Sequence, residues 1–208
     1  MNYLKKKKRS WRMAVRKNNF GDAVFKCRGI VWGVFTLIAL IFPYEYNFSR
    51  FILGSFFLVA GQAFRFWAAG YIPNYRTSTI GAPKLVVWGP YKWIRNPLYL
   101  GNFVMGLGWT LMLGWLCVLA FSVAFLTLYM LIVIPAEEKF LESKFGEAYL
   151  EYKKNVPSFF PFKLVPFRND GTDEVGFNRE VAWTGEVYSL RMNILISVAV
   201  LFKLFLVK

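Results

Sequence analysis

Long runs of apolar residues, separated by shorter polar segments, dominate the pattern along this chain. Within each run the apolar positions are nearly continuous, which differs from the single apolar face of a helix on a soluble protein. Each run is close to the roughly 17–25 residues that an α-helix needs to cross a bilayer. The pattern therefore predicts an all-α integral membrane protein with about five transmembrane helices, at Cys27–Pro43, Phe51–Ile72, Leu98–Leu113, Gly114–Pro135 and Ile194–Val207.

The segment Ala136–Asn155 follows the fourth run directly and has an amphipathic pattern instead. Glutamates and lysines fill most of its positions. Its large apolar residues recur along one helical face: Leu141, Phe145, Tyr149 and Tyr152. We expect the fourth transmembrane helix to leave the bilayer here and to continue as an interfacial helix. Residues 136–189 as a whole are expected to form a large inner segment before the last helix.

Charge indicates which way the chain is oriented. The sequence has 26 Lys and Arg against 12 Asp and Glu, and ten of those basic residues lie within residues 1–28, beside the single acid Asp22. A basic segment next to an apolar run is typical of a cytoplasmic N-terminus, and it attracts anionic lipid headgroups. No stacking platform or folded reader accompanies it, so nucleic acid is not an expected partner. We interpret residues 1–26 as a basic arm and 27–208 as one membrane domain.

The absence of histidine removes several kinds of chemistry. The sequence contains no His and only two Cys. Ser-His-Asp and Cys-His catalysis are therefore excluded, and so are nearly all zinc sites. No metal site is expected.

Polar residues stand at the start of the third apolar run, in the stretch GPYKWIRNPLYLG. Asn96 and Pro97 are favourable residues for a helix start, because Asn can cap and Pro needs no N–H partner there. The free N–H groups and positive dipole end, beside Arg95, would form an anion site. The alternative is an interfacial anchor, in which Arg95 binds a headgroup phosphate and Tyr91 and Tyr99 belong to an aromatic belt.

A second polar feature is the pair Glu137 and Glu138 at the end of the fourth run. They could be the solvated end of a helix. If the third and fourth helices form a hairpin, however, the pair and Arg95 face one region. Arg65 lies inside the second run, and an arginine within the membrane is a functional-site candidate unless it reaches the interface.

The two motifs together resemble a known family. GPYKWIRNPLYLG, followed after a hairpin by EEKFLESKFGEAYLEYKKNVPSFFP, is similar to isoprenylcysteine carboxyl methyltransferases and phospholipid methyltransferases, integral membrane enzymes that use S-adenosylmethionine. The resemblance covers about half of the chain, from Gly61 to Pro161. The matching positions are Gly89, Pro90, Tyr91, Arg95, Asn96, Pro97, Tyr99, Gly101, Glu137, Glu138, Phe145, Gly146, Tyr149, Tyr152, Val156 and Pro157.

The resemblance implies that the two motifs enclose S-adenosylmethionine. Arg95 and the helix start would hold the cofactor's carboxylate, and a glutamate would hold its ribose hydroxyls or amino group. Arg95 and Glu138 are the catalytic candidates. Asn96 replaces the family's usual histidine, so no mechanism can use that position as a general base. The implied cofactor-binding set is Tyr91, Arg95, Asn96, Pro97, Tyr99, Gly101, Glu137 and Glu138.

The methyl acceptor implied by the resemblance is a lipid or lipid-like amphiphile that enters sideways between helices. Its acceptor group stays open: a carboxylate needs no proton removal, whereas an amine or a thiol does. Candidates for the substrate side are Arg65, Arg76, Phe159 and Phe160. The alternative function is a non-catalytic scaffold or lipid-binding protein with the same fold. A transporter is disfavoured because few polar residues lie within the runs.

Overall fold

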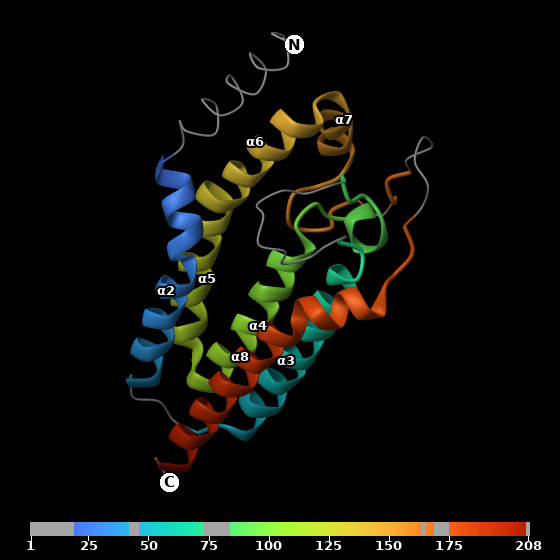
Figure 1. Cartoon of the computed structure of the whole chain (residues 1–208). Helices are drawn as coiled ribbons and strands as arrows, with labels where there is room; N and C mark the ends of the chain where they lie inside the picture. Colours follow the sequence, from blue (N-terminus) through green and yellow to red (C-terminus); the bar gives the residue numbers. More distant parts are fainter. Residues whose placement is uncertain (1–18, 42–45, 73–83, 164, 169–174, 207–208) are drawn as a thin grey trace.

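The computed structural model consists of helices joined by short irregular segments (Figure 1). No strand occurs in the part of the chain that it describes. Side chains are described from residue 29 to residue 203, and the basic arm up to residue 18 lies outside the described residues. The residues described are 19–41, 46–72, 84–163, 165–168 and 175–206.

Each predicted apolar run overlaps one of the helices, although the bounds differ. The helices are α2 (Asn19–Ile41), α3 (Phe48–Ala69), α4 (Pro97–Leu113), α5 (Trp115–Leu128) and α8 (Arg179–Leu206). Three helical stretches are long and apolar enough to cross a bilayer, namely Phe48–Ala69, Trp115–Phe145 and Arg179–Lys203. Two more are apolar but shorter, Gly29–Ile41 and Pro97–Leu113. The all-α integral membrane fold is confirmed, and five crossings stay a prediction.

Helices α3 and α4 pack backbone against backbone, because glycines line their contact. A Cβ atom at Gly54 would lie 2.5 Å from the carbonyl oxygen of Gly108, and one at Gly61 would lie 2.9 Å from that of Gly101. Lipid tails are as apolar as leucine, so helices in a bilayer associate through such close approach rather than through hydrophobic burial. These four glycines therefore permit the close approach of α3 and α4.

The fourth apolar run continues without a break into the amphipathic segment. Helix α5 passes through a π-helical turn, η2 (Tyr129–Val133), into α6 (Ile134–Phe145). Within the turn, Ile134 donates its N–H to the carbonyl of Tyr129, five residues earlier. Pro135 has no N–H and its ring crowds the preceding turn, which gives the wider turn a local cause.

The predicted interfacial helix 136–155 is two helices rather than one. Gly146 has φ +57° and ends α6, and α7 (Glu147–Asn155) begins directly after it. A positive φ is strained for other residues, so the glycine permits this change of direction. Helix α7, the 3₁₀ turn η1 (Gly89–Lys92) and the segment 156–168 gather at one end of the bundle, which we call the α7 end (Figure 1).

Helix α8 begins earlier than the sequence pattern indicated. We expected the last transmembrane helix to start at Ile194, with the residues up to Ser189 in the inner segment. Instead α8 starts at Arg179 and has 28 residues. Its first turns contain Glu186, which is only 2% exposed and ion-paired inside the bundle. Glu186, which we expected in the inner segment, is therefore an interior contact of a helix, whereas Arg179, Glu180 and Thr184 on the same turns are exposed.

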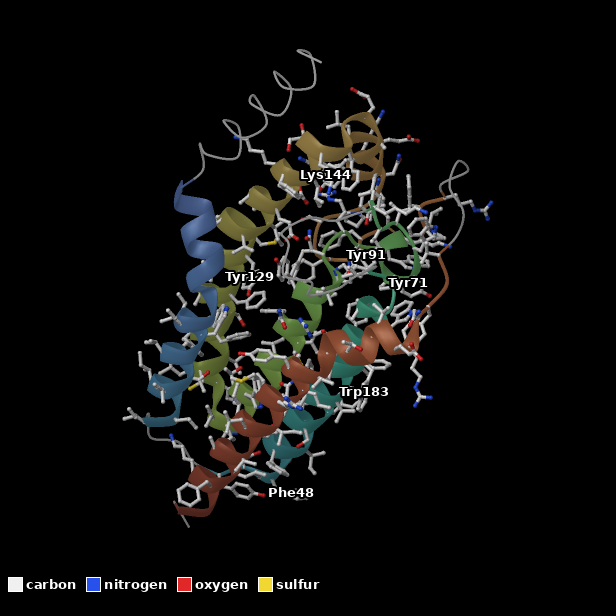
Figure 2. All side chains as sticks on the ribbon, in the orientation of Figure 1. Phe48, Tyr71, Tyr91, Tyr129, Lys144 and Trp183 are labelled. Atoms are coloured by element: carbon white, nitrogen blue, oxygen red, sulfur yellow. The ribbon has the colours of Figure 1, made fainter. Side chains whose placement is uncertain are left out.

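The outer surface of the bundle is apolar. Phe48 marks one end of the molecule and Lys144 the other in Figure 2. Between them, large apolar side chains with at least half of their surface exposed lie on four helices, including Ile38, Phe56, Leu119 and Phe202. Such a continuous apolar surface is suited to contact with lipid tails.

Candidate functional site

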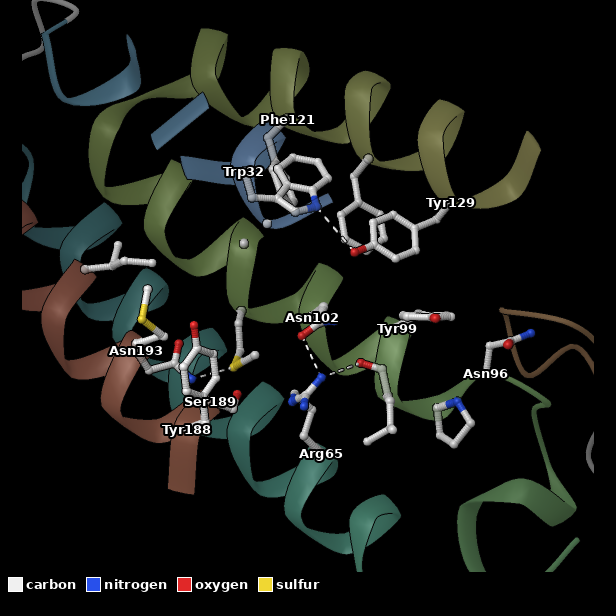
Figure 3. A pocket seen from close by; sticks show the side chains of 18 of the residues that line it. Trp32, Arg65, Asn96, Tyr99, Asn102, Phe121, Tyr129, Tyr188, Ser189 and Asn193 are labelled. Carbon is white, nitrogen blue, oxygen red and sulfur yellow. Dashed lines mark hydrogen bonds between the residues drawn. The ribbon is translucent and has the colours of Figure 1, made fainter. Parts of the chain in front are cut away.

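A cavity of about 1180 Å³ runs beside α4 from Asn96 at the α7 end to Leu113 at the other. These positions are about 25 Å apart along a helix that rises 1.5 Å per residue. Residues of α2, α5, η2, α6, α7 and α8 complete the walls. The α7 end of the cavity is polar and aromatic, and the far end is apolar. Figure 3 shows part of its lining.

At the α7 end, Arg95 and Glu138 form a largely buried ion pair. Arg95 donates from Nε and Nη2 to Glu138 Oε1, at 2.9 Å and 2.7 Å. Each of the two side chains is 10% exposed. Lys153 on α7 adds a second cation, with its Nζ 3.5 Å from Glu138 Oε2. The start of α4 and the exit of the fourth run therefore converge, as the hairpin topology predicted.

Arg95 is occupied by the protein itself. Its Nη1 donates to the carbonyls of Lys153, at 2.9 Å, and of Val156. The backbone continues the attachment, because Arg95 N donates to Pro157 O at 2.9 Å and Asn96 N to Ser158 O at 3.1 Å. Four of its five N–H groups are thus used within the protein, so a cofactor carboxylate could make a two-pronged contact with this guanidinium only by displacing one of these partners. The arrangement makes Arg95 a residue that holds the end of α7 against the start of α4.

Asn96 occupies the N-cap position of α4, and Pro97 is the first helical residue, as expected. The predicted cap itself is wrong, however, because the Asn96 side chain makes no capping hydrogen bond. Its Nδ2 donates instead to the carbonyl of Ser158 at 3.0 Å and to the Ser158 hydroxyl at 3.3 Å. The residue that replaces the family histidine thus joins Arg95 in fixing the segment after α7.

Glu137 and Glu138 point in different directions, since neighbouring residues on a helix are about 100° apart. Glu137 lines the cavity, whereas Glu138 faces Arg95. The Tyr99 hydroxyl donates to Glu137 Oε2 at 2.8 Å. Tyr99 in turn packs on Tyr129, with ring centroids 4.8 Å apart. Glu137 is therefore the member of the pair that a ligand in the cavity can reach.

Two buried tyrosines of α7 also line this end, and sequence reasoning did not place them in the site. Tyr152 donates its hydroxyl to the carbonyl of Tyr91 at 2.7 Å. Tyr149 is 1% exposed, and its hydroxyl has no hydrogen-bond partner among the described residues. Burial raises the pKa of both hydroxyls; for Tyr149, Glu138 adds to the shift and Arg95 opposes part of it. Both hydroxyls stay protonated and able to donate.

Arg65 meets a partner from the last helix. Its Nε and Nη2 donate to the two carboxylate oxygens of Glu186, at 2.9 Å and 2.6 Å. Its Nη1 donates to Asn102 Oδ1 at 2.7 Å (Figure 3). The Arg65 side chain is 5% exposed and that of Glu186 3%. The Arg65 side chain therefore points into the bundle. The alternative that it extends to the membrane interface does not hold. Gln62 donates to Glu186 at 3.2 Å and accepts from Asn193.

The remaining predicted residues fall in different places. Gly101 is absent from the cavity wall, because it packs against α3, where a Cβ would collide with the Arg65 side chain. Phe159 is 1% exposed in an aromatic cluster with Phe103 and Phe125, and Phe160 packs against it. Neither phenylalanine lines the cavity. Arg76 lies outside the described residues.

The fold and the cavity define a helical membrane protein with a ligand-sized space that opens from a polar end into an apolar one. The profile of the phospholipid methyltransferase family matches residues 49–148, which confirms the family resemblance. That segment covers α3, α4, the hairpin, α6 and the beginning of α7. Helices α2 and α8, which line much of the cavity, lie outside it.

Named relatives agree with this match. The chain is 37% identical to the cobalt-zinc-cadmium resistance protein CzcN of Cupriavidus metallidurans over 135 residues, which are 64% of this chain and 54% of the relative. It is 40% identical to the protein-S-isoprenylcysteine O-methyltransferase of Schizosaccharomyces pombe over 83 residues, 39% of this chain and 34% of the relative.

A third relative transfers a methyl group to sulfur. The chain is 36% identical to the methanethiol S-methyltransferase of Crocosphaera subtropica over 72 residues, 35% of this chain and 27% of the relative. The chain spans about half or less of the length of each of these three relatives. Two of the three are named methyltransferases.

Proposed function

We propose that this protein is a membrane methyltransferase that moves a methyl group from S-adenosylmethionine to a lipid-like amphiphile. The observation that carries the proposal is the cavity, which joins a polar, tyrosine-rich end to a long apolar end within one space. The segment matched by the phospholipid methyltransferase family, residues 49–148, includes Arg95, Tyr99 and Glu137 of the polar end. A scaffold that only packs against lipid has no use for an internal cavity of this kind.

The volume of the cavity is consistent with two ligands. Sites for a single small molecule usually measure about 300–1,000 Å³. At about 1180 Å³ this cavity exceeds that range. A methyltransferase must hold donor and acceptor side by side, because the rate of methyl transfer depends on their alignment.

The α7 end fits the donor. S-adenosylmethionine, when bound, supplies a methyl group on a positively charged sulfur. Glu137 is placed to accept hydrogen bonds from ribose hydroxyls or from the amino group. Tyr149, whose buried hydroxyl makes no hydrogen bond to the described residues, is placed to donate to the carboxylate. Arg95 and Glu138 act through α7, because their contacts hold Tyr149 and Tyr152 in the cavity wall.

The apolar end fits the tail of an amphiphile. The cavity rim between α2 and α8 includes Leu37 and Leu195, which are 62% and 61% exposed. An opening flanked by such side chains leads into lipid, so the acceptor enters from the bilayer and the donor from the polar end. We further propose that the α7 end faces the cytoplasm, where the basic N-terminal arm would lie under the positive-inside rule.

The carboxylates constrain how the acceptor could lose a proton. Glu138 and Glu186 do not line the cavity, so neither is placed to take a proton from a ligand. Glu137 is the carboxylate in the described part of the cavity wall that could do so. A carboxylate acceptor would need no base, whereas an amine or thiol acceptor would depend on Glu137.

Binding of S-adenosylhomocysteine tests the proposal without knowledge of the acceptor. We would measure it by calorimetry on protein in lipid nanodiscs, for the wild type, Tyr149→Phe and Glu137→Gln. Tyr46→Phe, at an exposed position at the opposite end of α3, is the matched control. We expect saturable binding that weakens in both cavity variants and is unchanged in the control. Folded wild-type protein that binds no S-adenosylhomocysteine but still binds amphiphiles would favour a lipid-binding scaffold.

A further inference from the structure

The apolar end of the cavity is closed. Ala39 on α2, Leu113 on α4 and Val200 on α8 all line it, and all three belong to one buried cluster with at most 8% of their surface exposed. Beyond them, Lys203 Nζ lies 3.4 Å from the carbonyl oxygen of Ala39 and joins α8 to α2. We call this closure the floor of the cavity. A chain that extends from the polar end stops there.

The α2 wall of the cavity leaves room beside its backbone. Gly29 and Gly33 on α2 both line the cavity, and a Cβ atom at either position would meet nothing within 4 Å. Glycines four residues apart on a membrane helix usually mark a contact with another helix. Among the described residues no helix covers this pair, so its bare backbone leaves room for an apolar chain beside it.

The wall that α8 supplies is held in register by polar contacts. The Arg65–Glu186 pair and the Gln62–Asn193 contact join the first half of α8 to α3. Farther along α8, the Ser197 hydroxyl lies 3.3 Å from Trp109 Nε1 on α4. These contacts oppose both rotation and sliding of α8. The α8 residues that line the cavity are therefore fixed, and they include a row of small or aliphatic side chains on successive turns: Ser189, Met192, Ile196, Ala199 and Val200.

We propose that the floor makes this half of the cavity a ruler for one linear apolar chain of the acceptor, and that Ala199 and Leu113 determine the longest chain accepted. The chemistry at the head of that chain rests on the proposed methyltransferase function. From Tyr99 to Leu113 the available length is about 21 Å at 1.5 Å per residue of α4. A shorter chain leaves part of the cavity empty, and a longer one must bend or force the floor apart. Interiors tolerate overpacking poorly.

A series of N-acetyl-S-alkyl-cysteines, from octyl to eicosyl, tests the ruler. Saturable binding of each probe would be measured to protein in nanodiscs and expressed per mole fraction of probe in the bilayer. This scale matters because tails gain as much from lipid as from an apolar cavity. We expect nearly constant affinity up to one chain length and a fall of about tenfold beyond it, the size of an overpacking penalty.

Two variants should move that limit in opposite directions. Ala199→Phe fills the cavity near its floor, and the limit should fall by several carbons; Leu113→Ala removes bulk, and the limit should rise. Val198→Phe is the matched control, because Val198 is next in sequence but 57% exposed and outside the cavity wall. Its limit should equal that of the wild type.

The outcomes separate the two proposals. Affinity that is independent of chain length, or a limit that Ala199→Phe leaves in place, overturns the ruler even if S-adenosylhomocysteine binds. A limit that moves as expected in protein that binds no S-adenosylhomocysteine supports the ruler and overturns the methyltransferase. Competition by ordinary two-chain phospholipids equal to that of the best probe would also overturn a site for a single chain.

Discussion

Replacement of Glu186 by glutamine would test the buried pair between α3 and α8. Glutamine keeps the size of the side chain but removes the charge that balances Arg65, which is 4% exposed. Loss of one partner of a buried ion pair costs about 3–5 kcal/mol, because the remaining charge stays in a poorly solvated place. With about 2–4 °C per kcal/mol for a chain of this size, the midpoint of thermal unfolding should fall by roughly 6–20 °C.

The double variant Arg65→Met/Glu186→Met separates the charge from the packing. Removal of both charges leaves no uncompensated ion, and apolar replacements of buried pairs are often close to neutral. Asn102 and Gln62 lose partners, so we expect recovery of at least half of the loss rather than all of it. Unfolding would be followed in nanodiscs by intrinsic fluorescence.

Glu180→Gln is the control, because Glu180 lies on the same helix but is exposed. It should change the midpoint by less than the uncertainty of the measurement. If Glu186→Gln unfolds like the wild type, or if the double variant is as unstable as the single one, the pair does not hold α8 in place. The fixed register of the cavity wall would then lose its physical basis.

Three further outcomes can be measured. Tyr149→Phe should weaken S-adenosylhomocysteine binding about five- to tenfold, the size of one hydrogen bond, and leave the unfolding midpoint unchanged because the hydroxyl makes no hydrogen bond to the described residues; a fall in stability with unchanged binding would contradict this. Gly101→Ala should cost about 1–3 kcal/mol, since its Cβ would meet the Arg65 side chain and lie 3.1 Å from the Gly61 carbonyl oxygen, and a midpoint equal to that of the wild type would show that α3 and α4 can separate freely. Burial raises the pKa of Tyr149 and Tyr152 in the folded state, so both tyrosines stabilise the fold below the ordinary tyrosine pKa of about 10, and this stabilisation is lost as pH rises beyond it. The free energy of unfolding should therefore fall above about pH 10, and it should fall less in Tyr152→Phe.

The sequence was sufficient for the arrangement of the site but not for its hydrogen bonds. Arg95 precedes one helix of a hairpin and Glu138 ends the other, so topology alone brings them together. Where the Nη1 donors of Arg95 point depends on the carbonyl of Lys153, in the last turn of α7, and on that of Val156, in the irregular segment after it. The same segment takes the Asn96 side chain away from its predicted cap.

The beginning of α8 was missed for a related reason. A surface helix shows its polar residues to water, and a membrane helix is expected to have few of them. Glu186 faces inward to an arginine 121 residues earlier in the chain, so no local pattern identifies it. Arg65 itself was the available signal, because a charge inside an apolar run requires a partner somewhere.

The π-helical turn sets the angular phase of everything that follows it. Tyr129 and Glu137 both line the cavity. Eight residues of regular α-helix, at about 100° each, would leave them about 80° apart around the axis. The wide turn absorbs one residue and returns about 100°, which brings the two within about 20° of one another. Deletion of Leu131, on the outward side of that turn and 71% exposed, would convert the wide turn into regular α-helix, and seven residues at about 100° each would still leave Glu137 within about 20° of Tyr129. The polar site therefore tolerates the loss of this one lipid-facing residue, whereas one residue inserted into the regular helix after the turn would rotate Glu137 out of the cavity and Glu138 away from Arg95 by about 100°.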